Sequence, residues 1–400
     1  MTATADVVVV GGGAMGASIA YHLVAAGAGR VVLLEREVAL GLGSTGRCAG
    51  GFRHQFSSEI NVRLSLASVR MIRSFTEEHG LPLDVHAEGY LFLVRDAVSW
   101  TAYRAAAAMQ RSLGARVDEL DAADVGELMP GVALDGIAGA TFGPDDGIAD
   151  PSGLTNGYAT LARRAGVEIR LGVEVTAIRT AGRGAGRGGA AGDRETAGGR
   201  VTGVETSAGR IDAPVVVNAA GVWASALTST CGVELPIEPQ PRHIIVTSAF
   251  PGRPERRTLV IDTGTMFYFH REGAGVLMGM PRLQDAVATF ETTVDDRWIA
   301  EELVPAAVRV LPALESAGLA RAWVGLYEMT PDRHAILGPV EDLDGLFLAV
   351  GFSGHGFQHA PIVGKVVSEL IIGATPTVDV SSLRLERFTR GELIGESHVV

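Results

Sequence analysis

DVVVVGGGAMG, residues 6–16, is the stretch that decides the fold, because a run of valines passes directly into three closely spaced glycines. Consecutive β-branched residues predict a buried parallel strand, and the apolar pattern that follows predicts a helix over 17–29. Gly11 allows a tight turn, Gly13 lets the backbone approach a pyrophosphate, and Gly16 lets the helix pack closely on the strand. The free N–H groups at the start of that helix favour a bound phosphate.

A second apolar run, VVLL at 31–34, ends at Glu35 and completes a strand–helix–strand unit. Glu35 follows the glycines by about 20 residues, where a carboxylate can accept hydrogen bonds from ribose hydroxyls. Three glycines alone would also suit an ordinary turn. With strand, helix, strand and acid in register, the sequence predicts a Rossmann-like dinucleotide-binding domain.

The bulk properties narrow the class of protein. A chain of 400 residues predicts two domains. The net charge of −12 argues against nucleic acid and anionic membranes. We expect neither a signal peptide nor a membrane span. Cys48 and Cys231 suggest neither a metal site nor a disulfide framework, so we expect no metal and a cytoplasmic location.

Two glycine-rich segments lie far from the first one. Residues 41–56, GLGSTGRCAGGFRHQF, form a longer loop than a compact domain needs unless it wraps a ligand. GFSGHGF, residues 351–357, follows an apolar strand at 346–350 and precedes a helix expected from about 360 to 372. This second strand–loop–helix junction provides another helix N-terminus for an anion or dipole.

In the rest of the sequence, segments with the apolar spacing of a helix alternate with segments typical of strands. Helices are expected over 61–78, 99–113, 118–128, 151–164 and 298–310, and strands over 89–94, 167–171, 173–178, 201–206, 215–221, 266–270 and 275–279. Residues 180–200 are rich in glycine and arginine and predict a flexible insertion between two strands.

Together these motifs resemble the FAD-dependent oxidoreductases of the D-amino-acid oxidase superfamily. The resemblance is greatest to the branch with sarcosine oxidase, dimethylglycine dehydrogenase and the proline dehydrogenase β-subunit. It covers most of the chain, from Asp6 to about Ile372. Five motifs carry it in order: the first glycine turn, GSTG at 43–46 leading to Arg53-His54, VVVNAAG at 215–221, MTPDRH at 329–334 and GFSGHGF at 351–357.

The resemblance implies an α/β fold in which a Rossmann-like FAD-binding domain is interleaved with an α+β substrate domain built on an antiparallel sheet. The FAD-binding domain would comprise residues 1–85, 145–230 and 325–378. The substrate domain would comprise 86–144 and 231–324, and 379–400 would form a C-terminal tail.

The resemblance also implies which residues contact FAD. Glu35 would hold the adenosine ribose, Val175 would bracket the adenine, and the 44–50 loop would follow the pyrophosphate, the ribityl chain and the flavin edge. Backbone N–H groups of 354–358 would face the flavin N1/C2 side, where the reduced flavin is negative. The full set is Gly11, Gly13, Ala14, Met15, Gly16, Glu35, Arg36, Ser44, Thr45, Arg47, Ala49, Gly50, Val175, Ala219, Ala220, Gly221, Gly354, His355, Gly356, Phe357 and Gln358.

Two positions depart from the monomeric sarcosine oxidases. Their FAD-linking cysteine corresponds to Gly325, so we expect noncovalent FAD. Their substrate-binding lysine corresponds to Gln358, and their oxygen-activating lysine has no counterpart, since Lys365, the only lysine, lies too far along the last helix. The electron acceptor, O2 or another carrier, therefore stays open.

The reaction that the resemblance implies is oxidation of a small secondary or N-methylated amino acid, or amine, to an imine by hydride transfer to flavin N5. Arg53 would hold the substrate carboxylate through a bidentate fork, unless it is a surface arginine. Tyr268 and His270 share one side of a strand and would position the amine or accept its proton; otherwise they are its polar face. Gln358 completes the catalytic set.

Other polar residues near these motifs suggest supporting roles. His54 would brace Arg53, Cys48 would pack, and His334 would be structural, whereas His355 is equally suited to chemistry and to holding its loop. Two alternative functions remain: an FAD-dependent 2-hydroxy-acid dehydrogenase, and a flavoprotein that acts in binding or assembly without turnover. The oligomeric state stays open.

Overall fold

The computed structural model describes residues 3–182, 199–282 and 288–398. The chain forms two compact units. Unit 1 comprises Met1–Gly46, Ser152–Glu238 and Glu328–Gly395, and unit 2 comprises Arg47–Pro151, Pro239–Tyr327 and Glu396–Val400. Residues 47–85, assigned above to the FAD-binding domain, thus belong to the second unit. Most of the glycine- and arginine-rich 180–200 segment lies outside the described residues.

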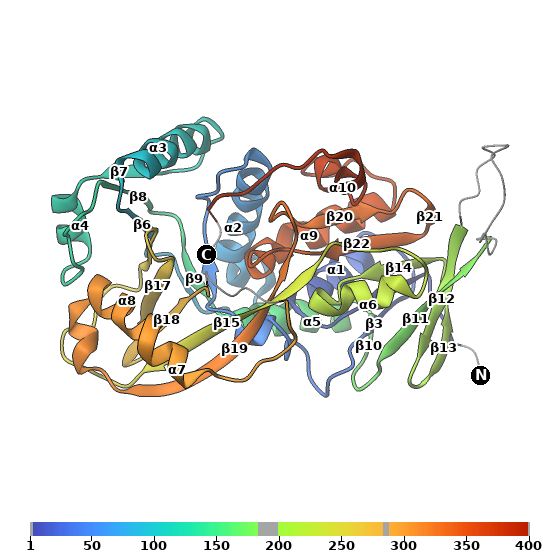
Figure 1. Cartoon of the computed structure of the whole chain (residues 1–400). Helices are drawn as coiled ribbons and strands as arrows, with labels where there is room; N and C mark the ends of the chain where they lie inside the picture. Colours follow the sequence, from blue (N-terminus) through green and yellow to red (C-terminus); the bar gives the residue numbers. More distant parts are fainter. Residues whose placement is uncertain (1–2, 183–198, 283–287, 399–400) are drawn as a thin grey trace. The chain divides into compact units, whose positions relative to one another are not determined.

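Unit 1 is built on a six-stranded sheet with the order β10-β3-β2-β14-β22-β20. Neighbouring strands are parallel except for the antiparallel pair of β20 and β22. All four valines of β2 are buried, as a strand covered on both faces requires. Figure 1 labels most of this sheet. The strand bounds are β2 (Val7–Val10), β3 (Val31–Leu34), β10 (Glu168–Arg170), β14 (Val215–Asn218), β20 (Ile336–Pro339) and β22 (Leu346–Val350).

Two helices of unit 1, α1 (Ala14–Ala25) and α9 (Gly356–Ile371), pack directly against each other. Ser18 Oγ lies 3.5 Å from the carbonyl oxygen of Pro361, and a Cβ at Gly364 would come within 2.2 Å of Ser18 Oγ. Helix α9 begins a few residues before its expected start near 360. Because α1 follows β2 and α9 follows β22, both helices begin at the same edge of the sheet.

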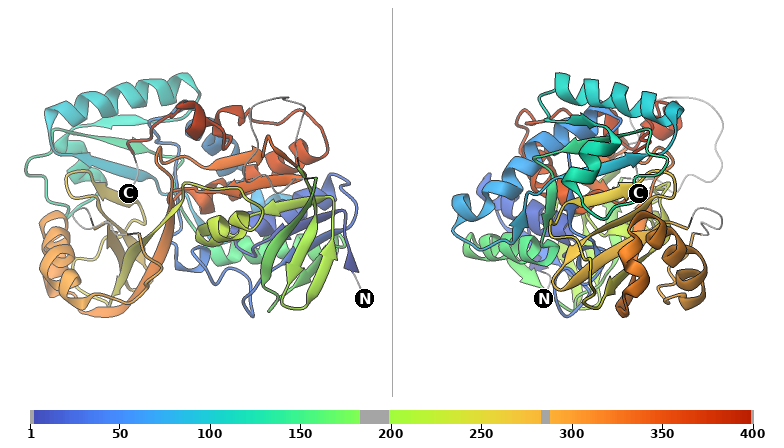
Figure 2. Two further views of the ribbon diagram at one scale, coloured as in Figure 1. Left: turned by 45° about the vertical axis from the view of Figure 1, so that its right-hand side comes forward. Right: turned by 90° about the vertical axis from the view of Figure 1, so that its left-hand side faces the viewer.

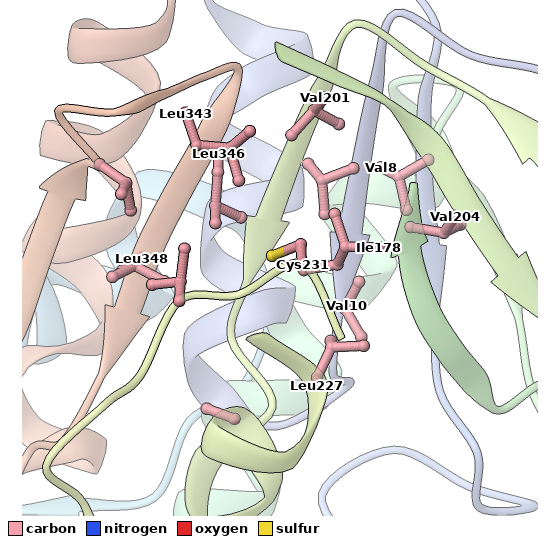
Figure 3. Close-up of a cluster of buried hydrophobic side chains, with 14 of the residues drawn as sticks. Val8, Val10, Ile178, Val201, Val204, Leu227, Cys231, Leu343, Leu346 and Leu348 are labelled. Carbon is pink, nitrogen blue, oxygen red and sulfur yellow. The ribbon is translucent and has the colours of Figure 1, made fainter. Parts of the chain in front are cut away.

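A second sheet of unit 1 has the order β1-β13-β12-β11, with β21 paired to β12. Its side chains Ile178, Val201 and Val204 share one apolar core with Val8 and Val10 of β2 (Figure 3). The strands are β1 (Ala3–Thr4), β11 (Val175–Ala181), β12 (Gly199–Thr206), β13 (Gly209–Asp212) and β21 (Leu343–Asp344). Helices α5 (Pro151–Arg164) and α6 (Ala224–Ser229) also belong to this unit.

The tail predicted over 379–400 contains ordered structure, namely η5 (Ser381–Leu383) and α10 (Arg387–Arg390). Arg387 Nε and Nη2 donate to the two carboxylate oxygens of Asp332 at 2.7 and 2.9 Å. Burial acts to raise the pKa of Asp332, but the Arg387 guanidinium and His334 together hold that pKa below its usual value. His334, in the same buried group, donates its backbone N–H to Asp332.

Unit 2 is built on an eight-stranded sheet with the order β19-β15-β18-β17-β16-β6-β8-β7. Alternate side chains of its strands enter different cores, as a pleated strand requires. Leu91 and Phe269 pack with α8 (Val304–Val310) and the helical turns before it, whereas Phe92 and Tyr268 pack with Tyr103. The strands are β6 (Tyr90–Val94), β7 (Asp118–Leu120), β8 (Gly139–Gly143), β15 (Glu238–Thr247), β16 (Leu259–Asp262), β17 (Phe267–Glu272), β18 (Gly275–Met280) and β19 (Leu319–Met329).

Helices flank this sheet, and α3 (Ala97–Ser112) lies alongside β6 and β8 (Figure 2). The helix predicted over 118–128 is instead a strand, β7, followed by α4 (Ala122–Leu128), because Asp121 and Asp124 form a capping box that starts the helix there. The helix over 298–310 contains a π-helical turn, η3 (Ile299–Leu303), between α7 (Asp296–Trp298) and α8 (Val304–Val310).

The rest of unit 2 comprises α2 (Glu59–His79) and a small sheet of β4 (Gly51–Phe52), β5 (Val85–His86) and β9 (Gly147–Ala149). Across the described part of the chain, no helix combines the length and hydrophobicity needed to cross a membrane.

Candidate functional site

The turn after β2 has the geometry that only glycine permits. Gly11 has a φ of 106°, and a Cβ there would lie 2.4 Å from the carbonyl oxygen of Ala219. At Gly16 a Cβ would lie 1.9 Å from the carbonyl oxygen of Gly11. Helix α1 therefore starts immediately beyond the turn and directs its first N–H groups toward the carboxyl edge of the sheet. These features form a cradle that fits a dinucleotide pyrophosphate.

Glu35, at the end of β3, is fixed beside this turn. Its Oε2 accepts a hydrogen bond from the N–H of Gly12 at 2.6 Å, and its Oε1 accepts one from the N–H of Glu37 at 2.8 Å. The next residue, Arg36, stacks its guanidinium on the Trp223 ring at 3.9 Å. The acid predicted to bind the ribose thus lies beside the glycine turn.

Residues 41–46 of the long glycine-rich loop return to the same turn. The N–H of Gly41 donates to the carbonyl oxygen of Gly12 at 2.9 Å, and the N–H of Gly46 donates to that of Gly41 at 2.8 Å. Thr45 Oγ1 accepts from the N–H of Ala14, the first residue of α1, at 3.2 Å. The structure thus brings Thr45, and with it the neighbouring Ser44, to the N-terminus of α1.

The ends of β14 and β22 complete this edge of unit 1. Ala219, Ala220 and Gly221 follow β14, and Ala219 contacts Gly11. The 354–358 segment leads into the first turn of α9. In that turn, the Nε2 atoms of Gln358 and His359 are 3.2 Å apart. Residues 11–16 and 354–358 therefore lie at one edge of one sheet, as a shared cofactor requires. Val175 begins β11 and packs against the same core as Ala220.

Glu328 is a member of this group that sequence reasoning missed. Its backbone carbonyl accepts from the N–H of Ser353 at 3.1 Å, in the turn that leads from β22 to α9. Burial raises the pKa of its carboxyl group to about 7, although the N–H groups of Gly351 and Phe352 act in the opposite direction. No periodicity marks this residue, because its neighbours come from distant parts of the chain.

Arg53 lies in unit 2 and is a buried residue, only 3% exposed, so it is not a surface arginine. Its Nη1 donates to the carbonyl oxygen of Gln55, and its Nη2 donates to that of His398 at 2.5 Å. The guanidinium carbon lies 4.1 Å from the centre of the Phe56 ring and 5.3 Å from that of Phe92. The residue predicted to hold a carboxylate thus occupies a buried aromatic setting.

Residues 396–398, which we call the strap, cover this arginine within unit 2. Glu396 is 3% exposed, and its carboxylate accepts hydrogen bonds from Ser57, Ser58 and Asn61 around the start of α2. The His398 ring stacks on Tyr103 with 4.1 Å between ring centres. No motif in the sequence marks the strap, because the contacts of Glu396 join residues more than 330 positions apart in the chain.

Tyr268 and His270 lie on β17, and both approach the Cys48–Ala49 segment. Burial raises the pKa of Tyr268 well above its ordinary value, with a further rise from the neighbouring Tyr327. His270 Nε2 lies 3.1 Å from the carbonyl oxygen of Ala49, and its Nδ1 lies 2.9 Å from that of Arg271. Burial lowers the pKa of His270. A neutral ring carries a single N–H, so His270 donates a hydrogen bond to only one of these two carbonyl oxygens at a time.

The remaining expected residues of unit 2 are held by local contacts. Arg47 Nη1 donates to the carbonyl oxygen of Val324 at 2.9 Å, next to Gly325. The N–H of Gly50 lies 3.2 Å from the Cys48 sulfur, and burial raises the pKa of the Cys48 thiol to about 11. That thiol therefore stays protonated, in agreement with a packing role.

His54, expected to brace Arg53, is tied instead to a buried acid. Its Nδ1 lies 2.6 Å from Asp146 Oδ1, which also accepts from the His54 backbone N–H at 2.9 Å. Gln55 donates to the other carboxylate oxygen of Asp146 at 3.1 Å. Asp146 therefore fixes the backbone that carries Arg53.

Comparison with known proteins agrees with the nucleotide-binding geometry of unit 1. A model of the FAD dependent oxidoreductase family matches residues 6–370. The chain belongs to this family. It is accordingly an FAD-dependent oxidoreductase, and FAD is its cofactor.

Three relatives illustrate the range of the family. FAD-dependent oxidoreductase domain-containing protein 1 of Xenopus laevis is 33% identical over 99% of this chain and 85% of its own length. Mitochondrial sarcosine dehydrogenase of Homo sapiens is 29% identical over 97% of this chain, which spans only 42% of that protein. The crystal structure of L-proline dehydrogenase from P. horikoshii has a TM-score of 0.87 and 30% identity, covering 98% of this chain and 100% of its own.

Proposed function

We propose that this enzyme oxidises a small secondary or N-methylated amino acid, or a related amine, to an imine, with the substrate carboxylate bound by Arg53. One observation carries the proposal: Arg53 is buried against Phe92 on the same face of the eight-stranded sheet as Tyr268. Two relatives support the substrate class, because they are named for sarcosine and for proline, both secondary amino acids.

Three residues of unit 2 would have different roles in binding the substrate. A substrate carboxylate would replace the carbonyl oxygens of Gln55 and His398 as acceptors of the Arg53 hydrogen bonds, and a guanidinium suits a carboxylate in bidentate geometry. Tyr268 stays protonated, so it would donate a hydrogen bond and position the amine instead of removing a proton. His270 would hold the Ala49 carbonyl in place. Bound FAD supplies the hydride acceptor, flavin N5.

An anaerobic reduction screen tests this proposal. The purified holoenzyme is mixed without oxygen with amino acids, N-methyl amino acids and 2-hydroxy acids, and the loss of flavin absorbance is followed. We expect secondary or N-methylated amino acids to bleach the flavin. Reduction by 2-hydroxy acids alone would indicate the dehydrogenase alternative, and a flavin that no compound reduces would favour the binding or assembly role.

The electron acceptor and the location complete the proposal. Gln358 brings no positive charge to the flavin region, and the electron acceptor therefore stays open between O2 and another carrier. The rate at which the reduced enzyme reoxidises in air decides between them. We also propose a cytoplasmic location. Cys48 and Cys231 form no disulfide, which suits a reducing compartment.

A further inference from the structure

The carboxyl group of Glu328 is a buried ionisable group that the proposed reaction does not use. It lies in unit 1 between two turns, those that follow β14 and β22. The N–H groups of Gly351 and Phe352 hydrogen-bond to the carboxyl, and a Cβ at Gly221 would lie 3.9 Å from Oε2. Oε2 itself is buried, and no residue in the described part of the chain offers it a hydrogen bond.

A buried oxygen atom without a donor is costly, by about 1–3 kcal/mol, and native proteins retain few of them. The position of this one indicates what its donor is. Along the sheet the order is β3 with Glu35, β2 with the glycine turn, β14 with Gly221, and then β22. Glu35 and Glu328 therefore lie on opposite sides of the glycine turn.

The chemistry of FAD matches this order. If the adenosine ribose lies at Glu35 and the pyrophosphate at the N-terminus of α1, the part of FAD beyond the pyrophosphate extends toward β14 and β22. Pyrophosphate oxygens only accept hydrogen bonds, whereas each ribityl hydroxyl can donate one. We propose that Glu328 is an FAD ligand whose Oε2 accepts a hydrogen bond from a ribityl hydroxyl.

A double-mutant cycle between protein and cofactor tests this directly. The apoproteins of the wild type, Glu328→Gln and Glu328→Leu are titrated with FAD and with its 2′-, 3′- and 4′-deoxyribityl analogues, and Kd is read from flavin fluorescence. We expect one analogue to bind the wild type about tenfold more weakly than FAD, the ratio that the loss of one hydrogen bond worth about 1.4 kcal/mol gives. Glu328→Leu should bind FAD about tenfold more weakly and should not distinguish that analogue.

Two controls separate a ligand from a structural residue. Glu302→Gln removes an exposed carboxylate of the other unit and should leave every Kd unchanged. The apoprotein of Glu328→Gln should unfold at nearly the same denaturant concentration as the wild type, because the amide oxygen still accepts from the N–H groups of Gly351 and Phe352, which leucine would leave unpaired. Glu328→Gln keeps an acceptor and should lie between the other two in affinity.

The proposal is overturned if Glu328→Leu weakens FAD and all three analogues by the same factor, or if it leaves their affinities unchanged. The proposal depends on FAD as the cofactor and is independent of the substrate class. A failed amine screen would contradict the proposed function while leaving this titration intact.

Discussion

Arg53 is the residue on which the proposed substrate binding depends. Replacing it with lysine keeps the charge but removes the planar fork, so we predict that Arg53→Lys raises KM by about 10- to 100-fold and changes kcat less. Steady-state kinetics with the best substrate of the screen measures this. Arg63→Lys is the matched control, because Arg63 is an exposed arginine of α2 that pairs with Glu59.

The carbonyl contacts of Arg53 permit another explanation, in which the arginine only ties the strap to its surroundings. In that case Arg53→Lys would lower the thermal stability without changing KM. Measuring both quantities on the same preparation therefore decides which role Arg53 has. An unchanged KM would remove Arg53 as the carboxylate ligand.

Single residues differ in how far the sequence reveals them. Gly11 and Gly16 could be predicted, because each meets a backbone constraint that is set within a short stretch of chain. Tyr268 and His270 could be placed on one face because a strand has a period of two. The position of Glu328 could not be predicted, because its neighbours are the turns after β14 and β22, which only the folded chain brings close to it.

At the level of elements, the strap and the start of α2 form one hydrogen-bonded group. Glu396 accepts from Ser57 Oγ and N, from Ser58 Oγ and from Asn61 Nδ2. Ser58 is the N-cap residue of α2, and its side chain makes no capping bond of its own. The carboxylate also accepts from the backbone N–H of Ser58 at 3.2 Å, so Glu396 binds the N-cap residue through both its backbone and its side chain.

Glu396→Gln should weaken this group, because an amide oxygen is a poorer acceptor than a carboxylate. We predict that the free energy of unfolding falls by about 2 kcal/mol, the value of hydrogen bonds to a charged group. Hydrogen exchange should become faster in peptides that cover 55–61 and 394–398. Glu392→Gln, an exposed substitution in the same tail, serves as the control. Equal exchange in the two variants would contradict a role for Glu396 in holding the strap.

The strap should also respond to pH. Burial lowers the pKa of His398 from 6.5 to about 4; the neighbouring Glu396 opposes this shift and Arg53 adds to it. A released His398 takes up a proton near pH 6.5, whereas the bound one does so only near pH 4. Release is therefore favoured progressively as the pH falls from about 6.5 to about 4, and the bound strap is most stable above that window.

Hydrogen exchange at pH 7.5 and 5.5 measures this response, after correction for the intrinsic rate. We predict faster corrected exchange in 394–398 at the lower pH. His398→Asn cannot take up the proton and should lose the difference. Glu396 remains ionised in this window: burial acts to raise its pKa, but the hydrogen bonds from Ser57 and the interactions with His398 together hold that pKa at about 2. The same corrected rate at both pH values in the wild type would argue against His398 as the responding group.

For the whole molecule, the sequence predicted the order of most elements, including the two strand–loop–helix junctions that start α1 and α9. The boundaries of the compact units were less predictable, since residues 47–85 join unit 2 through β4, β5 and α2. The ion pair between Arg387 and Asp332 was equally hidden, because it joins residues 55 positions apart that belong to no shared pattern. Local constraints revealed turns and strands, whereas long-range packing decided which segments belong together.

The mode of FAD attachment is a property of the complete holoenzyme, and we predict that it is noncovalent. Gly325 on β19 offers no thiol at the position of the linking cysteine, and the Cys48 thiol stays protonated because its pKa is about 11. Acid precipitation should leave the yellow colour in the supernatant. A yellow pellet would show a covalent bond.

Because a noncovalent ligand stabilises the folded state by mass action, FAD added at 100 times its Kd should stabilise the apoprotein by about 2.7 kcal/mol. A Tm that rises with FAD concentration therefore tests the same prediction without denaturing the holoenzyme first.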